Sequence, residues 1–151
     1  MALREVPLAH GEFLAEALAE ARKALQEGEV PVGAVLVRDG QILARSHNRR
    51  EASGDPTAHA EVLALRAAGE TQGNWRLTGT VLYVTLEPCP MCAWAIRQAR
   101  VKQVVFGASD AQVGAAGSHW NLLWPEVESL GGIQEAECES LLREFFQERR
   151  D

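Results

Sequence analysis

The fold of this chain is limited most strongly by a strand, a helix and a second strand that follow one another between residues 80 and 106. Thr80 to Leu86 is apolar and rich in β-branched residues, which favour a strand. Pro90 to Arg100 has the spacing of a helix, and Val101 to Phe106 is again apolar. Two strands joined through a helix form a parallel pair with a right-handed crossover. The pattern predicts a sheet that contains parallel strands and has helices against its faces.

The N-terminal part predicts a helix followed by an antiparallel hairpin. Apolar residues recur at helical spacing from Glu12 to Gln26, and Gly28 is placed to end that helix. Val30 to Val37 and Gln41 to Asn48 are apolar runs separated by Arg38-Asp39-Gly40. Asp-Gly supplies the positive φ that a tight hairpin turn needs, so we expect the two runs to pair.

Two more helices and one irregular segment follow from the pattern. Asp55 suits a helix cap and Pro56 the first helical position, so a second helix is expected from there to about Ala68. An apolar stripe predicts the last helix and consists of Leu141, Leu142, Phe145 and Phe146. Ala108 to Ser118 is small and glycine-rich, which makes it a candidate substrate loop. With no linker or repeat, residues 1–151 are expected to form one α/β domain.

Composition and charge exclude several classes of protein. The 151 residues are 46% hydrophobic and 24% charged, as in soluble globular domains and unlike disordered or fibrous chains. No apolar run is long enough to span a bilayer, and Met1 to Gly11 lacks a secretory signal pattern, so we expect a cytoplasmic protein. The net charge of −6 repels nucleic acid, so contact with RNA requires a local basic patch.

Two cysteines and a histidine have the spacing of metal ligands. Cys89 and Cys92 stand three apart at the start of the helix after a strand, so their sulfurs share one face near the positive helix end. That position favours the thiolates that bind metal. His59, near the start of another predicted helix, completes a three-ligand zinc set with a fourth position left for water. A catalytic site needs such an open position, because zinc lowers the pKa of bound water to ~7.

Glu61, two residues after His59, is the candidate proton carrier. Residues at i and i+2 lie about 200° apart on an ideal helix, so Glu61 cannot stack beside His59 and must reach around the helix start. Given that reach, its carboxylate takes a proton from zinc-bound water and passes it to a ring nitrogen or a leaving amine.

Three other interpretations of these residues stay open at the level of sequence. Cys-x-x-Cys between a strand and a helix also describes a thioredoxin-like redox pair, although such a pair has no use for His59 and Glu61. A closed structural zinc site requires a fourth ligand, with Cys138, His10, His47 and His119 as the candidates. Cys138 falls on the apolar stripe of the last helix, so we expect it in the core. A zinc-stabilised binding module without turnover leaves the carboxylate of Glu61 without a purpose.

The motif residues resemble those of a known enzyme family. His59-Ala60-Glu61 followed by Pro88-Cys89-Pro90-Met91-Cys92 is similar to the signature of the zinc nucleobase deaminases. Residues 29–35, 55–61, 82–89 and 114–118 resemble the bacterial tRNA-specific adenosine deaminases, and the similarity extends from about Phe13 to Arg150. The resemblance implies a cytidine-deaminase-like three-layer fold, with a mixed five-stranded sheet and helices on both faces. It also implies a homodimer with one zinc ion per subunit that converts the anticodon wobble adenosine of a tRNA to inosine.

The same resemblance implies roles for individual residues. His59, Cys89 and Cys92 are implied to hold zinc, and Glu61 to shuttle protons. The residues implied to bind the substrate nucleotide are Asn48, Ala34, Pro88 and Asp110. The helix that ends in Arg149 and Arg150 is implied to touch the anticodon loop.

Three departures from the family pattern bear on RNA binding and leave the zinc chemistry untouched. Trp94 stands where the family usually has glycine, the chain between Asn121 and Cys138 looks shorter than usual, and Ser109 stands where some members carry a basic residue. With the negative net charge, they favour an alternative substrate, a free nucleobase or nucleoside of the guanine or cytosine type. The glycine-rich loop and the terminal arginines favour tRNA.

Overall fold

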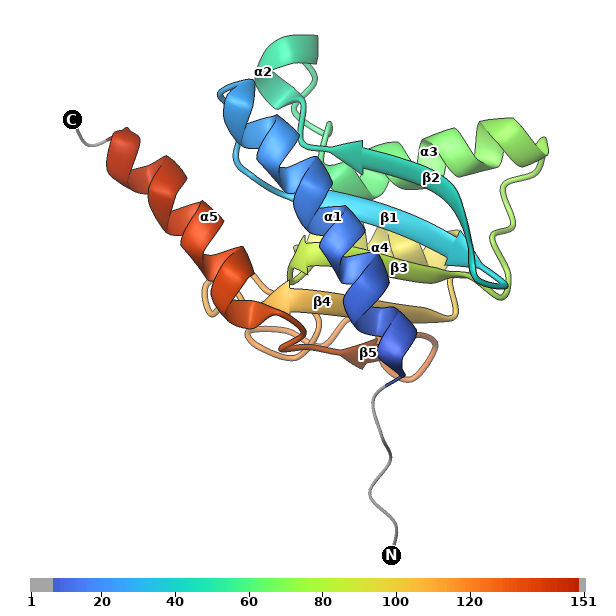
Figure 1. Cartoon of the computed structure of the whole chain (residues 1–151). Helices are drawn as coiled ribbons and strands as arrows, with labels where there is room; N and C mark the ends of the chain where they lie inside the picture. The colour runs from blue at the N-terminus through green and yellow to red at the C-terminus, as the bar shows by residue number, and fades with distance from the viewer. Residues whose placement is uncertain (1–6, 150–151) are drawn as a thin grey trace, which may run out of the picture.

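The computed structural model describes residues 7–149, which build a five-stranded mixed sheet (Figure 1). The strands are β1 (Gly33–Arg38), β2 (Gln41–His47), β3 (Val81–Leu86), β4 (Gln103–Ala108) and β5 (Glu128–Leu130). They lie in the order β2-β1-β3-β4-β5. β1 pairs antiparallel with β2 and β3, whereas β4 pairs parallel with both β3 and β5. The parallel pair around residues 80 to 106 and the mixed sheet are confirmed.

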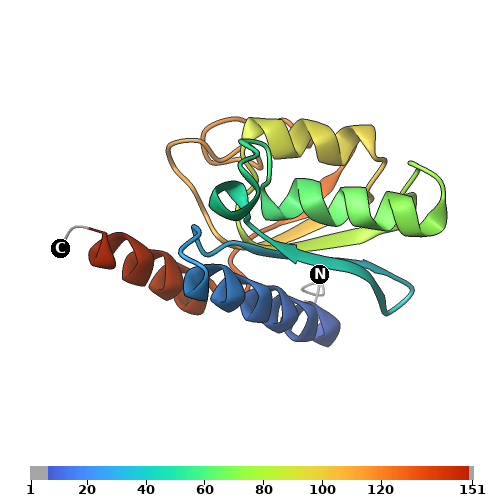
Figure 2. The same cartoon turned by 90° about the horizontal axis from the view of Figure 1, so that it is seen from above.

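Helices cover both faces of this sheet (Figure 2). They are α1 (Leu8–Gln26), α2 (Arg50–Ser53), α3 (Ala60–Gln72), α4 (Pro90–Gln98) and α5 (Glu135–Glu148). α3 and α4 lie against one face, while α1 and α5 lie against the other, which gives the expected three layers. Among the residues that the structure describes, no helix is both long and apolar enough to cross a membrane.

The central strands are apolar on both faces because alternate residues meet different helical layers. On β1, Leu36 packs into the core beneath α3 and α4, whereas Val35 packs into the core beneath α1. α1 approaches β1 closely at Gly33, where a Cβ atom would lie 2.0 Å from the backbone oxygen of Ala17. Only glycine fits this crossing, so the residue fixes how near the helix sits to the sheet.

The predicted hairpin is confirmed, and its turn has the predicted chemistry. β1 and β2 pair antiparallel through Arg38 and Gln41. Asp39 and Gly40 between them have φ of 50° and 76°. Positive φ at both central residues matches the right-handed twist of the two strands.

The second predicted helix is wrong at both ends. α3 begins at Ala60 with His59 as its N-cap and continues past Ala68 to Gln72. Asp55 does not cap it, because its carboxylate accepts hydrogen bonds from the backbone N–H and the hydroxyl of Thr57, at 2.8 and 2.7 Å. These bonds close a local turn instead of starting a helix. The polar segment between β2 and Asp55 contains the short helix α2.

Candidate active site and metal centre

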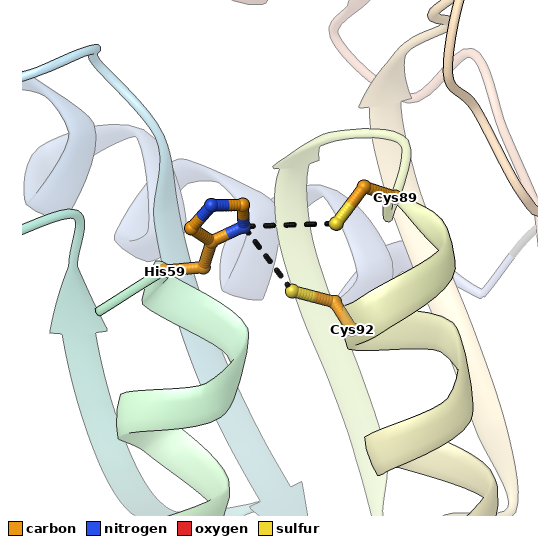
Figure 3. Close-up of side chains that lie close together, drawn as sticks. All are labelled: His59, Cys89 and Cys92. Carbon is orange, nitrogen blue, oxygen red and sulfur yellow. Dashed lines mark hydrogen bonds between the residues drawn. The ribbon is translucent and has the colours of Figure 1, made fainter. Parts of the chain in front are cut away.

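Three potential metal ligands meet where α3 and α4 begin (Figure 3). His59 immediately precedes α3 and Cys89 immediately precedes α4, and both have extended backbones with ψ of 148° and 171°. Pro90 opens α4, where its missing N–H removes no helical hydrogen bond, and Cys92 follows within the first turn. Because the two helices start close together at one edge of the sheet, ligands 30 residues apart in sequence face one another.

The separations between the ligand atoms fit one zinc ion. Nδ1 of His59 lies 3.7 Å from Sγ of Cys89 and 3.4 Å from Sγ of Cys92. A tetrahedral site with Zn–S bonds of ~2.3 Å and Zn–N bonds of ~2.0 Å has S···N edges of about 3.5 Å. Within residues 7–149, no fourth His, Cys, Asp or Glu joins this group. The donor set therefore fits an open zinc site better than a closed one.

The two thiols at this site influence each other strongly. A hydrogen bond from Cys92, helped by one from His59, lowers the pKa of Cys89 to about 4 against the opposing effect of burial. The same contact between the thiols, together with burial, raises the pKa of Cys92. Cys89 is thus the first of the pair to become a thiolate. A bound divalent cation would instead lower the pKa of Cys92, because a coordinating thiol loses its proton.

Glu61 lies in the first turn of α3 and is only 4% exposed. The 200° separation from His59, worked out for two residues of one ideal helix, does not apply, because His59 precedes the helix with an extended backbone. Both side chains consequently border one cavity without any reach around the helix. Burial raises the pKa of Glu61, while the charge of His59 opposes that rise. A raised pKa brings the carboxyl group toward the range in which it both accepts and donates a proton near neutral pH.

A cavity of about 150 Å³ opens beside two of the three ligands, His59 and Cys89. Its walls are formed by Val30, Val32, Asn48, Arg50, His59, Glu61, Leu86, Glu87, Cys89, Asp110 and Val113. Asn48, which follows β2, has a second contact that holds its amide in place. Its Oδ1 accepts a hydrogen bond from the backbone N–H of Ala60 at 2.8 Å. The Nδ2 group of Asn48 makes no such bond within the described part of the chain, so it remains a donor for whatever enters the cavity.

Of the other three predicted substrate residues, one lines the cavity and two do not. Asp110 lines the cavity, as expected of a residue that contacts substrate. Ala34 is completely buried in β1, and Pro88 is buried with its carbonyl accepting a hydrogen bond from the backbone N–H of Ala115 at 2.8 Å. Neither Ala34 nor Pro88 forms part of the cavity wall. Their contact with a substrate base stays a prediction.

The last helix lines a neighbouring cavity. Arg149 stacks its guanidinium 4.4 Å from the ring centroid of Phe145 and donates a hydrogen bond to the carbonyl of Gly28 at 2.7 Å. With both phenylalanines of α5, it borders a second cavity of about 240 Å³ that shares Val30, Asn48 and Arg50 with the first. Arg150, its predicted companion, lies outside the described residues.

Sequence reasoning missed the apolar wall and one acidic residue of the cavity. The missed residues are Val30, Val32, Leu86, Val113 and Glu87. Four of them stand within motifs that the resemblance already singled out, directly before β1 or directly before Cys89. Their position in those motifs was the available signal, but an apolar residue in a motif is indistinguishable from a core residue until the chain is folded.

The remaining histidines and Cys138 have other partners. Their contacts join His10 to Tyr83, His47 to Glu20 and Glu27, and His119 to Trp120. Cys138 is 1% exposed in the core that α1 shares with the sheet, which confirms the expectation from the apolar stripe. A closed zinc site therefore finds no fourth ligand among these candidates.

Comparison with known proteins identifies the family. A family model described as the cytidine and deoxycytidylate deaminase zinc-binding region matches residues 8–108. A tRNA-specific adenosine deaminase of Bacillus subtilis is 50% identical over 143 residues, covering 91% of this chain and 89% of its own. A solved structure from a study of A-to-I editing by tRNA:A34 deaminases matches with a TM-score of 0.81 at 43% identity, over 87% of this chain and 99% of that one. A guanine deaminase structure from Bacillus subtilis, 44% identical, gives a TM-score of 0.64 over 66% of this chain and 64% of its own. This chain belongs to the zinc-binding cytidine and deoxycytidylate deaminase family and, within it, to the tRNA-specific adenosine deaminases.

Proposed function

We propose that this chain is a zinc-dependent hydrolase that converts the wobble adenosine in the anticodon loop of a tRNA to inosine. The observation that carries the proposal is the cavity at which Asn48, His59, Glu61 and Cys89 converge. Relatives named tRNA-specific adenosine deaminase, at 50% and 43% identity, favour this substrate over a free base. The active form in this proposal is a cytoplasmic homodimer in which residues 1–151 form one deaminase domain.

The side chains at the cavity divide the reaction between them. His59, Cys89 and Cys92 hold the ion, which when bound supplies a hydroxide nucleophile at neutral pH by lowering the pKa of water to ~7. Glu61 accepts the proton that the water loses and delivers it to the ring nitrogen beside the amino-bearing carbon of adenine. It then transfers the proton of the hydroxyl group added to that carbon to the amine, and the carbon–amine bond breaks, so that adenosine and water give inosine and ammonia.

The remaining polar groups orient the nucleotide. Nδ2 of Asn48, left free by the bond from Ala60 to Oδ1, donates to the base, and Asp110 contacts the adjoining nucleotide. A base reaches such a small cavity only after it has left its stack, which costs less in a loop than in a duplex. Arg149, directly after α5, and its neighbour in sequence Arg150 contact the anticodon loop.

The proposal is tested by presenting the zinc-loaded protein with two kinds of substrate. One is a tRNA that carries adenosine at the wobble position, with the same tRNA lacking that adenosine as a control. The other is a series of free adenosine, guanine and cytosine. We expect inosine at the wobble position only and no ammonia from the free compounds. Ammonia from a free base without inosine in tRNA would refute the proposal and favour the alternative deaminase.

A variant tests the role of Glu61 in the same assay. Glu61→Gln removes the titrating group at nearly constant volume and is expected to reduce kcat about 10²–10⁴-fold, the usual contribution of general acid–base catalysis. Zinc content and unfolding temperature, measured in parallel, are expected to stay close to those of the wild type. Turnover at the wild-type rate would remove Glu61 from the proton transfer.

A further inference from the structure

One buried carboxylate at the cavity has no part in the reaction described above. Glu87 follows β3 and precedes the Pro88-Cys89 pair, and it is 3% exposed. Among the described residues, no lysine, arginine or histidine forms an ion pair with it. A buried charge without a counter-charge is unfavourable unless hydrogen-bond donors replace the water it has lost. The donors therefore show which segment of the chain the carboxylate binds.

All the donors to Glu87 come from one loop. Oε1 accepts from the backbone N–H of Asp110 at 3.0 Å and, in a very short contact, from the hydroxyl of Ser118. Oε2 accepts from the backbone N–H groups of Ala116 and Ser118, at 2.9 and 3.0 Å. Each oxygen thus accepts two bonds, which fills the usual capacity of a carboxylate. The loop of residues 110–118 is therefore wrapped around this single side chain.

The loop is shaped to admit the carboxylate. A Cβ atom at Gly114 would lie 2.5 Å from Cδ of Glu87 and 2.3 Å from the backbone oxygen of Asp110. Any other residue at position 114 therefore has to displace either the carboxylate or the loop. The backbone ties the same two segments together, since Ala115 donates to the carbonyl of Pro88 at 2.8 Å.

The same loop forms one wall of the cavity. Asp110 and Val113 line it together with Glu61 of α3. Asp110 is itself bonded to Glu87 through its backbone N–H, and Val113 lies between Asp110 and Ala116, the next residue bonded to Glu87. Figure 2 shows this segment, in orange, near the edge of the sheet where α3 and α4 begin. The position of these two side chains relative to His59 and Cys89 consequently depends on Glu87.

We propose that Glu87 is a positioning residue: it fixes the 110–118 loop as the nucleotide-binding wall without touching substrate or metal. This inference rests on the proposed function for the identity of the substrate. In substrate binding, the loop arrives preformed, so RNA does not have to order it. Loss of the carboxylate is therefore expected to weaken RNA binding while the zinc ligands and Glu61 continue to act.

Glu87→Gln is the decisive substitution, because it keeps the shape and replaces one acceptor with a donor. An amide nitrogen at the Oε1 position faces the N–H of Asp110, donor against donor, whereas the Ser118 hydroxyl can turn to accept. We expect KM for the tRNA to rise about tenfold, equal to ~1.4 kcal/mol, with kcat within about threefold of the wild type. We also expect one zinc per chain, and faster hydrogen exchange at the amides of residues 110, 116 and 118.

Two further variants keep the test decisive. Ser118→Ala removes only the hydroxyl and leaves the three backbone donors in place, so it is expected to raise KM less than Glu87→Gln does. Gly114→Ala disturbs the same contact from the loop side and is expected to raise KM as Glu87→Gln does. It substitutes for Glu87→Gln if that variant does not fold.

The outcomes separate this inference from the proposed function. Dissociation constants for an anticodon stem-loop RNA, measured by fluorescence anisotropy, and the exchange rates need no turnover. Wild-type protein that binds this RNA but makes no inosine would contradict the proposed function alone. The positioning role would be overturned if Glu87→Gln had the KM, the RNA affinity and the exchange rates of the wild type. It would also be overturned if the variant lost zinc and its KM did not rise.

Discussion

Asn48→Asp separates two tasks that one amide performs. Oδ1 accepts a hydrogen bond from the backbone N–H of Ala60 at 2.8 Å, at the first residue of α3, and the side chain is buried. Nδ2 bonds to none of the described residues, yet no polar side-chain atom among them is both buried and unpaired, so Nδ2 reaches the cavity. The first task stabilises the helix that carries Glu61, and the second is the proposed contact with the base.

The aspartate keeps the first task and loses the second. Its carboxylate still accepts from Ala60, and a negative charge at a helix N-terminus contributes ~0.3–1 kcal/mol, so we expect little loss of stability. It cannot donate to the base, and a missing hydrogen bond in a desolvated site costs about 1–3 kcal/mol. We therefore expect kcat/KM for tRNA to fall about 5- to 150-fold. Asn48→Ala loses both tasks, because the N–H of Ala60 is left without its partner and the unfolding free energy falls by about 1–3 kcal/mol.

Urea unfolding and steady-state kinetics of the wild type and both variants provide the measurement. The reasoning predicts that the two variants share the kinetic defect and that only Asn48→Ala has the stability defect. Full kcat/KM in Asn48→Asp would show that the amide does not donate to the base. Equal urea midpoints for Asn48→Ala and the wild type would show that the bond to Ala60 contributes nothing to stability.

Four further predictions follow from the structure. Removal of zinc with a chelator should abolish turnover. It should also lower the unfolding free energy by ~4 kcal/mol relative to protein in free zinc at 1,000 times the dissociation constant. Added zinc should restore both, as measured by activity assays and by melting at increasing zinc concentrations. Burial tends to raise the pKa of Glu20, but hydrogen bonds from three basic side chains outweigh it and lower the pKa. Its contribution to stability is therefore present above the unfolded-state pKa of ~4.3 and is lost as the pH falls, so Glu20→Gln should cost about 1–2 kcal/mol at pH 7 and much less in melts at pH 3. Gly33→Ala should destabilise the fold by about 2–3 kcal/mol through its clash with α1, whereas the control Gly69→Ala, with no atom nearer than 3.7 Å to the new Cβ in a helix, should stabilise it slightly in the same urea series. Arg149→Ala should weaken tRNA binding and reduce the slope of log affinity against log salt by about one, while an unchanged slope would place the RNA contact elsewhere.

Several parts of this protein follow from residues that are neighbours in sequence. The Asp39-Gly40 turn required positive φ and formed the predicted hairpin, and the strand, helix and strand around Cys89 formed the predicted parallel pair. The zinc ligands were recognisable because a donor set is defined by residue type and spacing near helix starts. In each case the physical cause acts within a few residues, so the local pattern carries the information.

Folding over longer distances settled the rest. Asp55 had the local properties of a helix cap, yet α3 starts five residues later, where the side chain of Asn48, directly after β2, accepts a hydrogen bond from the N–H of Ala60. That contact makes His59 a cap with an extended backbone and brings it to the same cavity as Glu61. The hydrogen bond from Ser118 to Glu87 spans 31 residues, and neither of the motifs that contain these residues indicates that the two pair. A hydrogen bond between distant segments forms only once the sheet has brought those segments together. The sequence therefore predicted the chemistry of the site, whereas its geometry depended on the tertiary structure.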